Sequence, residues 1–513
     1  MGLRRWAKPL RFSHICVVYF FEKGGCLPER LPPFLLYKSK IFFSKNQHFL
    51  RGKPPFIFNQ STFITSCANT LQSSISASVD PMKLSVLARK NSFLQRRSKL
   101  KPEEFVDMLI FSSFDHSQFS LQECCNELAQ HRQKSLSKVA LHKRFNPSSV
   151  AFLKSVLSEQ MSSRLNLGYL INRWQPFSRV LVADSCKFSL PKEYIEDYPG
   201  YGSFGKESGM MNIQYSFDLK NGDWENLELT KAIQNDQSHT KKTLQHICKD
   251  DLHIRDLGFI TQEYLLKIVK EDAFFLNRLN PKWKPVQHST GKPIDWSGLY
   301  KKMRHKGDCH FETMIIIGSG KNAFSCRLIA VTVPEQVYKE RIRKAQKQAK
   351  SHGLCLSDEY KERCRFSIFI TNVDEKILKA TDVIQLYRLR WQIELIFKNW
   401  KSLLGIHHVK AVKKDRFECQ LLAKLIWILL NWKIFKCIDA FIQKNSPGYA
   451  CSIWKFFKQV RQYSYALRKV ATGSMDFRDW CEIFICPIIK SLLIEPKKDK
   501  KPAFGIVNSI FNP

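Results

Sequence analysis

The spacing of apolar residues changes along the chain, and the change divides it into helical and β-rich parts. From Pro102 to about residue 145 the spacing is helical, with Ser120 as the N-cap of one helix and Ser135 or Ser137 as the N-cap of the next, joined by a short polar link. The second helix is rich in Lys, Arg and His. This pair is compatible with a helix-turn-helix, although any small helical bundle gives the same pattern.

A β-rich pattern follows, in which two apolar strands end at aspartates. Residues 179–183 form an apolar run that ends at Asp184, and residues 252–255 form a short strand that ends at Asp256. Between them, runs 211–217 and 224–230 flank Asn221-Gly222-Asp223, which predicts a hairpin. We expect a helix from Thr261 to about residue 270 and a further strand over 273–279.

The second half of the chain returns from strands to helices. Strands are predicted over 311–317, 326–333 and 366–370, with a very basic helix over 336–350. Gly318-Ser319-Gly320-Lys321 lacks the earlier glycine of a phosphate loop, because that position is Ile315, so a hairpin turn is favoured. A long helix is expected from a Thr381 cap to about residue 404, and an apolar helix over 416–441. The latter contains Lys424 and is too short and too charged to span a membrane.

These patterns predict an α/β protein in several parts. Residues 1–81 show no helical or strand periodicity, which indicates either an atypical N-terminal extension or, as we favour, a translation start at Met82. If Met82 is the true start, residues 1–81 should be loosely structured and dispensable. The rest of the chain is predicted to divide into four regions. These are a helical DNA-binding region over 82–175, a catalytic core over 176–280 and 370–445, a β-rich insertion over 281–369, and a helical C-terminal region with a basic tail over 446–513.

Charge points to a polyanionic partner. Lys and Arg total 82 and Asp and Glu total 46, a net charge of +36, which attracts nucleic acid first and an anionic membrane second. A protein that is simply basic is the alternative. The sixteen cysteines form no Cys-x-x-Cys pair, and Cys309-His310 has no partner pair nearby, which indicates reduced thiols in a cytoplasmic protein and no zinc site.

One face of the helix after residue 381 carries the chemistry. At about 100° per residue, Tyr387, Arg390, Glu394 and Lys401 fall on one narrow stripe, with Trp391 and Lys398 at its border and an apolar stripe opposite. A surface ion pair between Arg390 and Glu394 would explain the carboxylate without any function.

The aspartates at the strand ends favour a functional explanation. Ligand sites in α/β sheets gather at such ends, although a carboxylate there can also be a loop cap. Hard oxygen ligands suit Mg²⁺, and two such ions can activate a water and stabilise a leaving oxygen in phosphodiester chemistry. We therefore expect Asp184, Asp256 and Glu394 to meet at one site, where their mutual repulsion should raise acid pKa values.

The same residues carry a family resemblance. Tyr387-x2-Arg390-x3-Glu394-x6-Lys401 resembles the YREK signature of the insertion-sequence-four family of bacterial DDE transposases, and residues 387–398 are similar beyond those four letters. Residues 256–259 and 182–185 resemble the second and first aspartate motifs of that family, and Ile370-Thr371-Asn372 also fits. The resemblance covers roughly 82–445.

The resemblance implies a ribonuclease-H-like mixed-sheet core, with helical flanks and a β-rich insertion in the 138 residues (394 − 256) between the last two acids. It implies that Asp184, Asp256 and Glu394 bind two Mg²⁺ ions, for which Mn²⁺ can substitute. It further implies contacts from Tyr387, Arg390 and Lys401 to the transposon end, with Lys398 and Trp391 beside them.

The partners implied are DNA, as terminal inverted repeats and target, and a second copy of the chain in the synaptic complex, with movement by cut and paste through hairpinned ends. A nucleoid-associated cytoplasmic location and no membrane contact are expected.

Some features depart from the pattern or compete with it. Asn212 stands about where relatives often have a lysine, which bears on DNA affinity. Asp236 is a rival acid that we interpret as a loop residue near the site, and Asp251 is expected to precede the strand that Asp256 ends. The alternative functions are a catalytically inactive remnant that only binds DNA and a structure-specific nuclease on the same core.

Overall fold

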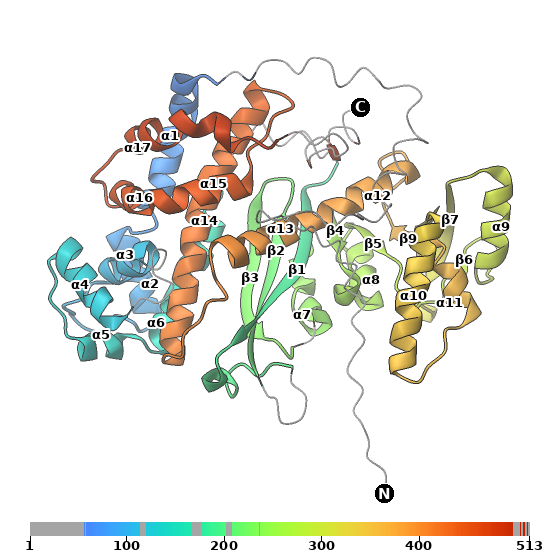
Figure 1. The fold of residues 1–513 in the computed structure, drawn as a ribbon, viewed down its shortest axis with the longest axis horizontal. Helices are drawn as coiled ribbons and strands as arrows, with labels where there is room; N and C mark the ends of the chain where they lie inside the picture. The colour runs from blue at the N-terminus through green and yellow to red at the C-terminus, as the bar shows by residue number, and fades with distance from the viewer. Residues whose placement is uncertain are drawn as a thin grey trace, which may run out of the picture.

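The computed structural model describes residues 56, 58–112, 120–165, 176–201, 208–234 and 236–495, with residues 503, 506, 507 and 510. A mixed sheet crosses the middle of the molecule, with helices packed around it (Figure 1). The order of its nine described strands is β3-β2-β1-β4-β5-β9-β8-β7-β6. Their bounds are β1 Arg179–Leu190, β2 Gly209–Asp218, β3 Asp223–Lys231, β4 Asp251–Arg255, β5 Phe274–Arg278, β6 Val286–Gln287, β7 His310–Ile317, β8 Phe324–Thr332 and β9 Phe366–Thr371.

The first five strands form the half of the sheet that carries the aspartates. β1, β2 and β3 are antiparallel, whereas β4 runs parallel to β1 and to β5. Gly222, with φ of +69°, makes the turn between β2 and β3, as the hairpin signal predicted. Three antiparallel strands followed by two parallel ones match the ribonuclease-H-like core expected from the sequence.

The β-rich insertion extends the core sheet instead of forming a sheet of its own. β9 pairs with β5 on one side and with β8 on the other, and β7 and β6 follow in antiparallel order. β7 and β8 are joined through the glycine-rich segment, where Gly318 has φ of +87°, so this segment is the expected hairpin connection. Helices α9 (Trp296–Lys306), α10 (Glu335–Ser351) and α11 (Asp358–Arg363) complete the insertion.

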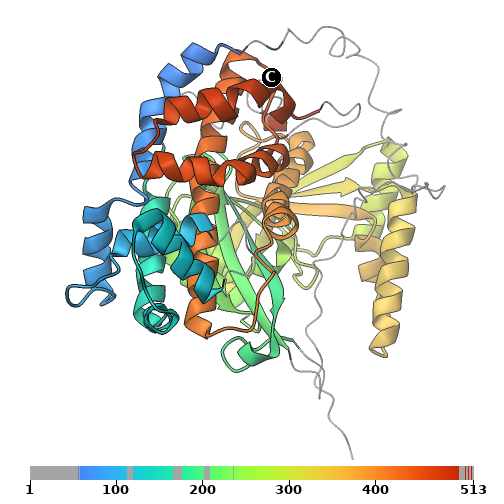
Figure 2. The same ribbon diagram turned by 60° about the vertical axis from the view of Figure 1, so that its left-hand side comes forward.

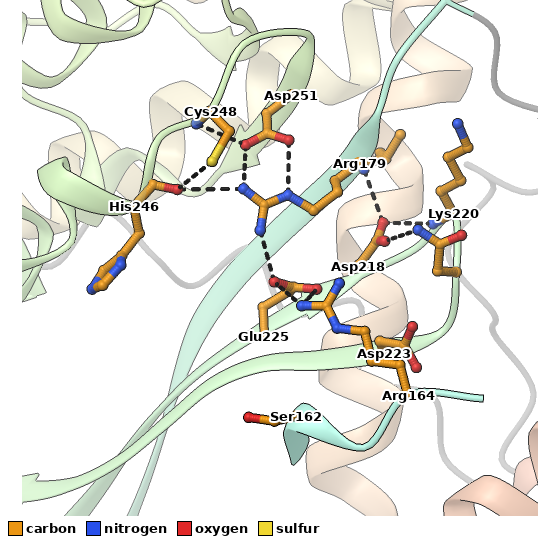
Figure 3. Close-up of polar contacts among 12 residues, drawn as sticks. Ser162, Arg164, Arg179, Asp218, Lys220, Asp223, Glu225, His246, Cys248 and Asp251 are labelled. Atoms are coloured by element: carbon orange, nitrogen blue, oxygen red, sulfur yellow. Dashed lines mark hydrogen bonds and ion pairs between the residues drawn. The ribbon is translucent and has the colours of Figure 1, made fainter. Parts of the chain in front are cut away.

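A buried ionic cluster fixes the end of the sheet at which β1 begins (Figure 3). Arg179 donates to both oxygens of Asp251, at 2.8 Å and 2.5 Å, and to Glu225 at 2.9 Å. Asp218 accepts the Val180 amide at 2.9 Å. These bonds tie β1 to β2, β3 and β4 at the end of β4 that lies opposite Asp256.

Helices from both ends of the chain surround the long helix α14 (Lys414–Asn445). Figure 1 shows α1 and the last helices together on one side of the sheet. Buried side chains occur around all of α14, which explains its apolar sequence. The described part of the chain contains no helix long and apolar enough to cross a membrane. The other helices of this region are α1 Gln60–Ser76, α2 Pro81–Lys90, α3 Pro102–Ser112, α4 Leu121–Arg132, α5 Lys138–Arg144, α6 Pro147–Ser162, α15 Ile453–Val460, α16 Ser464–Ala471 and α17 Phe477–Phe484.

One expectation for residues 1–81 is wrong. Residues 60–76 form α1, capped by Asn59, and its Phe63, Leu71 and Ile75 are almost completely buried against α14, α16 and α17. The serines and threonines between its apolar residues have low helix propensity, so the sequence pattern did not indicate a helix. In the structure, packing outweighs that low propensity. Residues 1–55 and 57, and the basic tail at 497–501, lie outside the described residues.

Candidate active site

Asp184 and Asp256 lie side by side where the parallel pairing of β1 and β4 stops. That pairing runs from Arg179–Asp251 to Ala183–Arg255, and each aspartate is the next residue on its strand. Asp256 ends β4 as expected and starts a 3₁₀ turn over Leu257–Phe259. The expectation that Asp184 also ends its strand is wrong, because β1 continues to Leu190 on the pairing with β2.

The helix that carries the third acid is divided into short segments. α12 (Ala380–Arg388) passes through a 3₁₀ turn at Leu389–Trp391 into α13 (Gln392–Lys398), which ends in a π-helical turn at Asn399–Leu403. It begins after Lys379 and has no side-chain cap, so the expected Thr381 cap is wrong. Changes of helical type inside a helix often mark functional positions, and here they coincide with Arg390 and Lys401.

Arg390 joins two of the three acids. Its Nη1 lies 3.2 Å from Asp184 Oδ2, and its Nη2 lies 2.6 Å from Glu394 Oε1. The ion pair between Arg390 and Glu394 therefore exists, but it is not an isolated surface pair, because the same guanidinium bonds an acid 206 residues away in sequence. This contact brings α13 against β1.

The electrostatics of Asp184 indicate that the three carboxylates share one environment. The pKa of Asp184 is raised to about 7, chiefly by burial and to a smaller extent by the charges of Asp256 and Glu394, while Arg390 and the Ser185 amide lower it. The expected direction is confirmed for Asp184, but burial contributes more to the rise than repulsion among the acids does. Within the described ranges, no three ligating side chains lie close enough to hold a metal ion in this conformation. Arg390 stands between two of the candidate ligands instead.

Tyr387 and Lys401 also face the strands that carry the aspartates. The Tyr387 hydroxyl donates to the Arg255 carbonyl at 3.4 Å, and burial raises the pKa of Tyr387 to about 12. Lys401 Nζ donates to the Lys187 carbonyl of β1 at 2.7 Å. Lys398 is exposed, and 39% of Trp391 is accessible to solvent, so both border the site on its outer side.

The competing acids have other positions. Asp251 is the first residue of β4 instead of preceding it, and its bonds to Arg179 place it at the other end of the strand. Asp236 begins the helix α7 (Asp236–Lys242) instead of lying in a loop, and it accepts from Gln214 at 2.9 Å. A Cβ atom on Gly258 would lie 3.9 Å from Asp236 Oδ2, so Asp236 remains near the site. Asn212 is completely buried on β2, and neither of its amide atoms has a hydrogen-bond partner.

Sequence reasoning missed Arg327, which holds the start of the helix bearing the acid, and noted Asn372 only through the family resemblance. Arg327 of β8 is buried and donates to the carbonyls of Val373 at 2.6 Å and Leu378 at 3.0 Å, on the segment between β9 and α12. Asn372 accepts the Phe275 amide and donates to the Ala273 carbonyl, both at 2.8 Å. Arg327 had no sequence signal, because its partners are backbone atoms 46 and 51 residues away.

Comparison with known proteins agrees with this arrangement. The family described as "Transposase DDE domain" matches residues 175–430, the segment that contains all three acids. The chain is 29% identical over 469 residues to the transposase for insertion sequence element IS1151 of Clostridium perfringens, covering 86% of this chain and 96% of that protein.

Two further relatives carry the same kind of name. The chain is 29% identical over 383 residues to the IS231B transposase of Bacillus thuringiensis subsp. berliner, which covers 71% of this chain and 80% of that protein. It is 26% identical to the IS421 transposase of Escherichia coli over 377 residues, 71% of this chain and 92% of that protein. The chain belongs to the DDE transposases of bacterial insertion sequences, enzymes that cleave and join DNA.

Proposed function

We propose that this transposase cuts the ends of its insertion sequence and joins them to target DNA, with Asp184, Asp256 and Glu394 as its catalytic acids. The observation that carries the assignment is the contact of Arg390 with both Asp184 and Glu394, which draws β1 and α13 together beside Asp256. The family membership supports the reaction class, and the resemblance of Tyr387 to Lys401 to the YREK signature supports the residues.

Membership in this family implies the use of a divalent metal, and the donor set here fits one. Three carboxylates supply hard oxygen atoms of the kind that Mg²⁺ and Mn²⁺ prefer. The pKa of Asp184 is raised mainly because the carboxyl is buried, and the neighbouring charges of Asp256 and Glu394 add to the rise, so a bound cation would stabilise the ionised form. We propose that the three acids hold two Mg²⁺ ions, which when bound supply an activated water and stabilise the leaving oxygen at the phosphodiester.

Arg390 has a different role before and after DNA arrives. Without DNA its guanidinium neutralises Asp184 and Glu394, and it must leave these two acids before they can turn their oxygens to a cation. A DNA phosphate offers the guanidinium a bidentate partner of the same charge as a carboxylate. Arg390 therefore moves from the acids to the transposon end. The arrival of DNA in this way frees Asp184 and Glu394 to bind the metal ions.

The neighbouring residues orient the DNA. Tyr387 and Lys401 are now bonded to the backbone of β4 and β1, so both stand next to the acids, and their polar groups can exchange a carbonyl for a phosphate. Lys398 and the exposed part of Trp391 lie outside them and can contact the phosphate and bases beyond the cut. A second copy of the chain is needed to hold the other transposon end in the synaptic complex.

Two other functions remain as alternatives. A DNA-binding remnant without catalysis is disfavoured because all three acids are present and the helix bearing Glu394 is held against β1. A nuclease without strand transfer would use the same three acids, so only the joining step distinguishes it from a transposase.

The test uses the full-length protein with a duplex that carries the element's terminal repeat and a labelled target. Asp184→Asn, Asp256→Asn and Glu394→Gln should each reduce cleavage by at least a thousandfold while retaining DNA binding, because a neutral amide cannot replace a carboxylate ligand. Glu263→Gln, at an exposed acid on the helix after Asp256, serves as a matched control for loss of one acid. Cleavage that persists in any of the three variants would reject that acid. Cleavage without joining by the unaltered protein would favour the nuclease.

A further inference from the structure

The insertion presents a rigid basic helix that the chemistry of the active site does not use. α10 has 17 residues, none of them buried, and in both ribbon views it runs beside the strands of the insertion and reaches beyond them at one end (Figures 1 and 2). Figure 2 shows its far end extending beyond the sheet. A helix with so little burial needs another reason for its composition.

The base of α10 is firmly anchored. Arg341 donates to the carbonyls of Cys364 at 3.1 Å and Phe366 at 2.7 Å. The guanidinium of Arg365 lies 4.1 Å from the Tyr338 ring centroid and 4.6 Å from that of Tyr300, which joins α10 to α9. The helix therefore projects from the insertion in a fixed direction.

Cations form a continuous stripe along the solvent side of α10. Lys339, Arg343, Lys347 and Lys350 are all exposed, and at about 100° per residue they fall within roughly 80° of one another. Arg343 also donates to both oxygens of Glu340 at 2.9 Å, an exposed pair that a phosphate can replace. The residues toward the insertion, including Arg341, Ala345 and Ala349, are partly covered. After Glu340 no acid occurs until Asp358, so the far end of the helix carries positive charge alone.

The dimensions of the stripe match a nucleic-acid backbone. Lys339 and Lys350 are 11 residues apart, which is about 16 Å along the helix. Duplex DNA carries one negative charge per roughly 1.7 Å of its axis, so that length of duplex presents about ten phosphates. A rigid row of four cations can contact several of these phosphates with little loss of entropy, which an exposed flexible tail could not do.

We propose that the solvent-facing stripe of α10, formed by Lys339, Arg343, Lys347 and Lys350, is a duplex-binding surface that contacts the DNA phosphate backbone outside the active site. This proposal rests on the proposed function in one respect, which is that DNA is the partner. Because phosphate contacts carry no sequence information, the stripe should add affinity for the element's end and for unrelated duplex alike.

The experiment measures the salt dependence of DNA affinity for full-length protein with two duplexes of equal length, one carrying the terminal repeat and one unrelated. The stripe variant carries Lys339→Gln, Arg343→Gln, Lys347→Gln and Lys350→Gln. The control removes four exposed cations from the C-terminal helices and the segment that follows them, on the other side of the molecule, through Lys458→Gln, Lys469→Gln, Arg478→Gln and Lys490→Gln. Both variants change the net charge by the same amount.

The stripe variant should reduce the slope of log affinity against log salt by roughly two to four on both duplexes, since each phosphate contact contributes about 0.9. The control should change the slope by less than one. A stripe variant that behaves like the control would overturn the proposal, as would a loss confined to the terminal repeat. Lys347→Glu against Lys469→Glu repeats the comparison with single changes, in case the quadruple variants lose helix content.

Failure of the proposed function would look different. If the unaltered protein bound the terminal repeat no better than unrelated duplex and cut neither, the transposase assignment would fail, whereas the slope comparison would still test the stripe.

Discussion

At the scale of single residues, the proposed function makes Arg390 the group that controls whether the three acids can accept a metal. Its bonds to Asp184 and Glu394 compete with cation binding, and its charge repels an incoming ion. The same side chain is expected to position the transposon end. Removing the Arg390 side chain should therefore separate its effect on metal binding from its effect on DNA positioning.

Arg390→Ala should therefore preserve or increase affinity for Mn²⁺ in the absence of DNA, while cleavage of the terminal repeat falls by at least a hundredfold. Calorimetric titration with Mn²⁺ alone measures the first effect and a cleavage assay the second. Lys398→Ala, at the border of the site, is the control and should leave Mn²⁺ affinity unchanged. An Arg390→Ala protein that no longer binds Mn²⁺ would show that the guanidinium organises the acids instead of blocking them.

Lys433 is a buried cation, and its unfavourable contribution to the free energy of unfolding can be measured. Its ammonium donates to Ser74 Oγ at 3.1 Å and Gln160 Oε1 at 3.3 Å, and burial lowers its pKa to about 8 from 10.5. The folded state therefore binds this proton less tightly than the unfolded state. Its unfavourable contribution is complete below about pH 8 and disappears as the pH rises toward 10.5.

Lys433→Met should raise the free energy of unfolding at pH 7 by about 1–2 kcal/mol, because relief of the ammonium's desolvation exceeds the loss of its two hydrogen bonds to uncharged acceptors. The gain should shrink as denaturant unfolding is repeated up to pH 10. Lys436→Met is the matched control, since Lys436 lies 2.6 Å from Asp223 and its loss leaves that carboxylate unpaired. Lys436→Met should destabilise the protein. Equal effects of the two substitutions would contradict this account.

At the scale of elements, the insertion fixes where the catalytic helix begins. Arg327 reaches from β8 to the carbonyls of Val373 and Leu378, so the segment before α12 is held by a strand of the insertion. This contact gives the insertion a positioning role that its place in the sequence does not reveal.

Arg327→Met should lower the free energy of unfolding by about 2–4 kcal/mol, because buried carbonyls and the Glu312 carboxylate lose their donor. It should also reduce cleavage more than it reduces DNA binding, since α12 leads into Arg390 and Glu394. Arg327→Lys, which keeps the charge and one or two donors, should recover part of both losses. Thermal unfolding and cleavage assays under the same conditions test this. If Arg327→Met loses stability but cleaves DNA normally, Arg327 stabilises the fold and does not position the helix that carries Glu394.

Elements with strong local signals were predictable, and those fixed by distant partners were not. The hairpin at Gly222 and the caps at Ser120 and Thr261 appear as the sequence indicated, because each depends on residues within a few positions. The end of β1 was wrong, because its last residues pair with β2, and a strand's partner cannot be seen in its own pattern. The sequence pattern also showed no sign that the helix changes type at Leu389–Trp391.

At the scale of the whole molecule, the first described helix and the last helices pack together on one side of the core. α1 packs on α14, α16 and α17, and the Phe63 ring centroid lies 5.1 Å from that of Phe441. Gln72 accepts the Phe477 amide at 2.7 Å and donates to the Val470 carbonyl at 3.3 Å. Asp107 of α3 binds Arg468 of α16 through both oxygens, at 2.9 Å and 2.6 Å. The helical regions before and after the catalytic core therefore share one hydrophobic interior.

This joint interior revises the expectation for a protein that begins at Met82. Such a chain lacks α1, so apolar surface of α14, α16 and α17 becomes exposed, and each large side chain lost removes about 1.5–3 kcal/mol of burial. We expect it to unfold at a clearly lower temperature than a chain that begins at residue 56, which keeps α1. Phe63→Ala in the full chain should reproduce part of the loss, about 3–4 kcal/mol. If the protein beginning at Met82 unfolded at the same temperature as the longer one and bound DNA as well, α1 would be dispensable and the original expectation would hold.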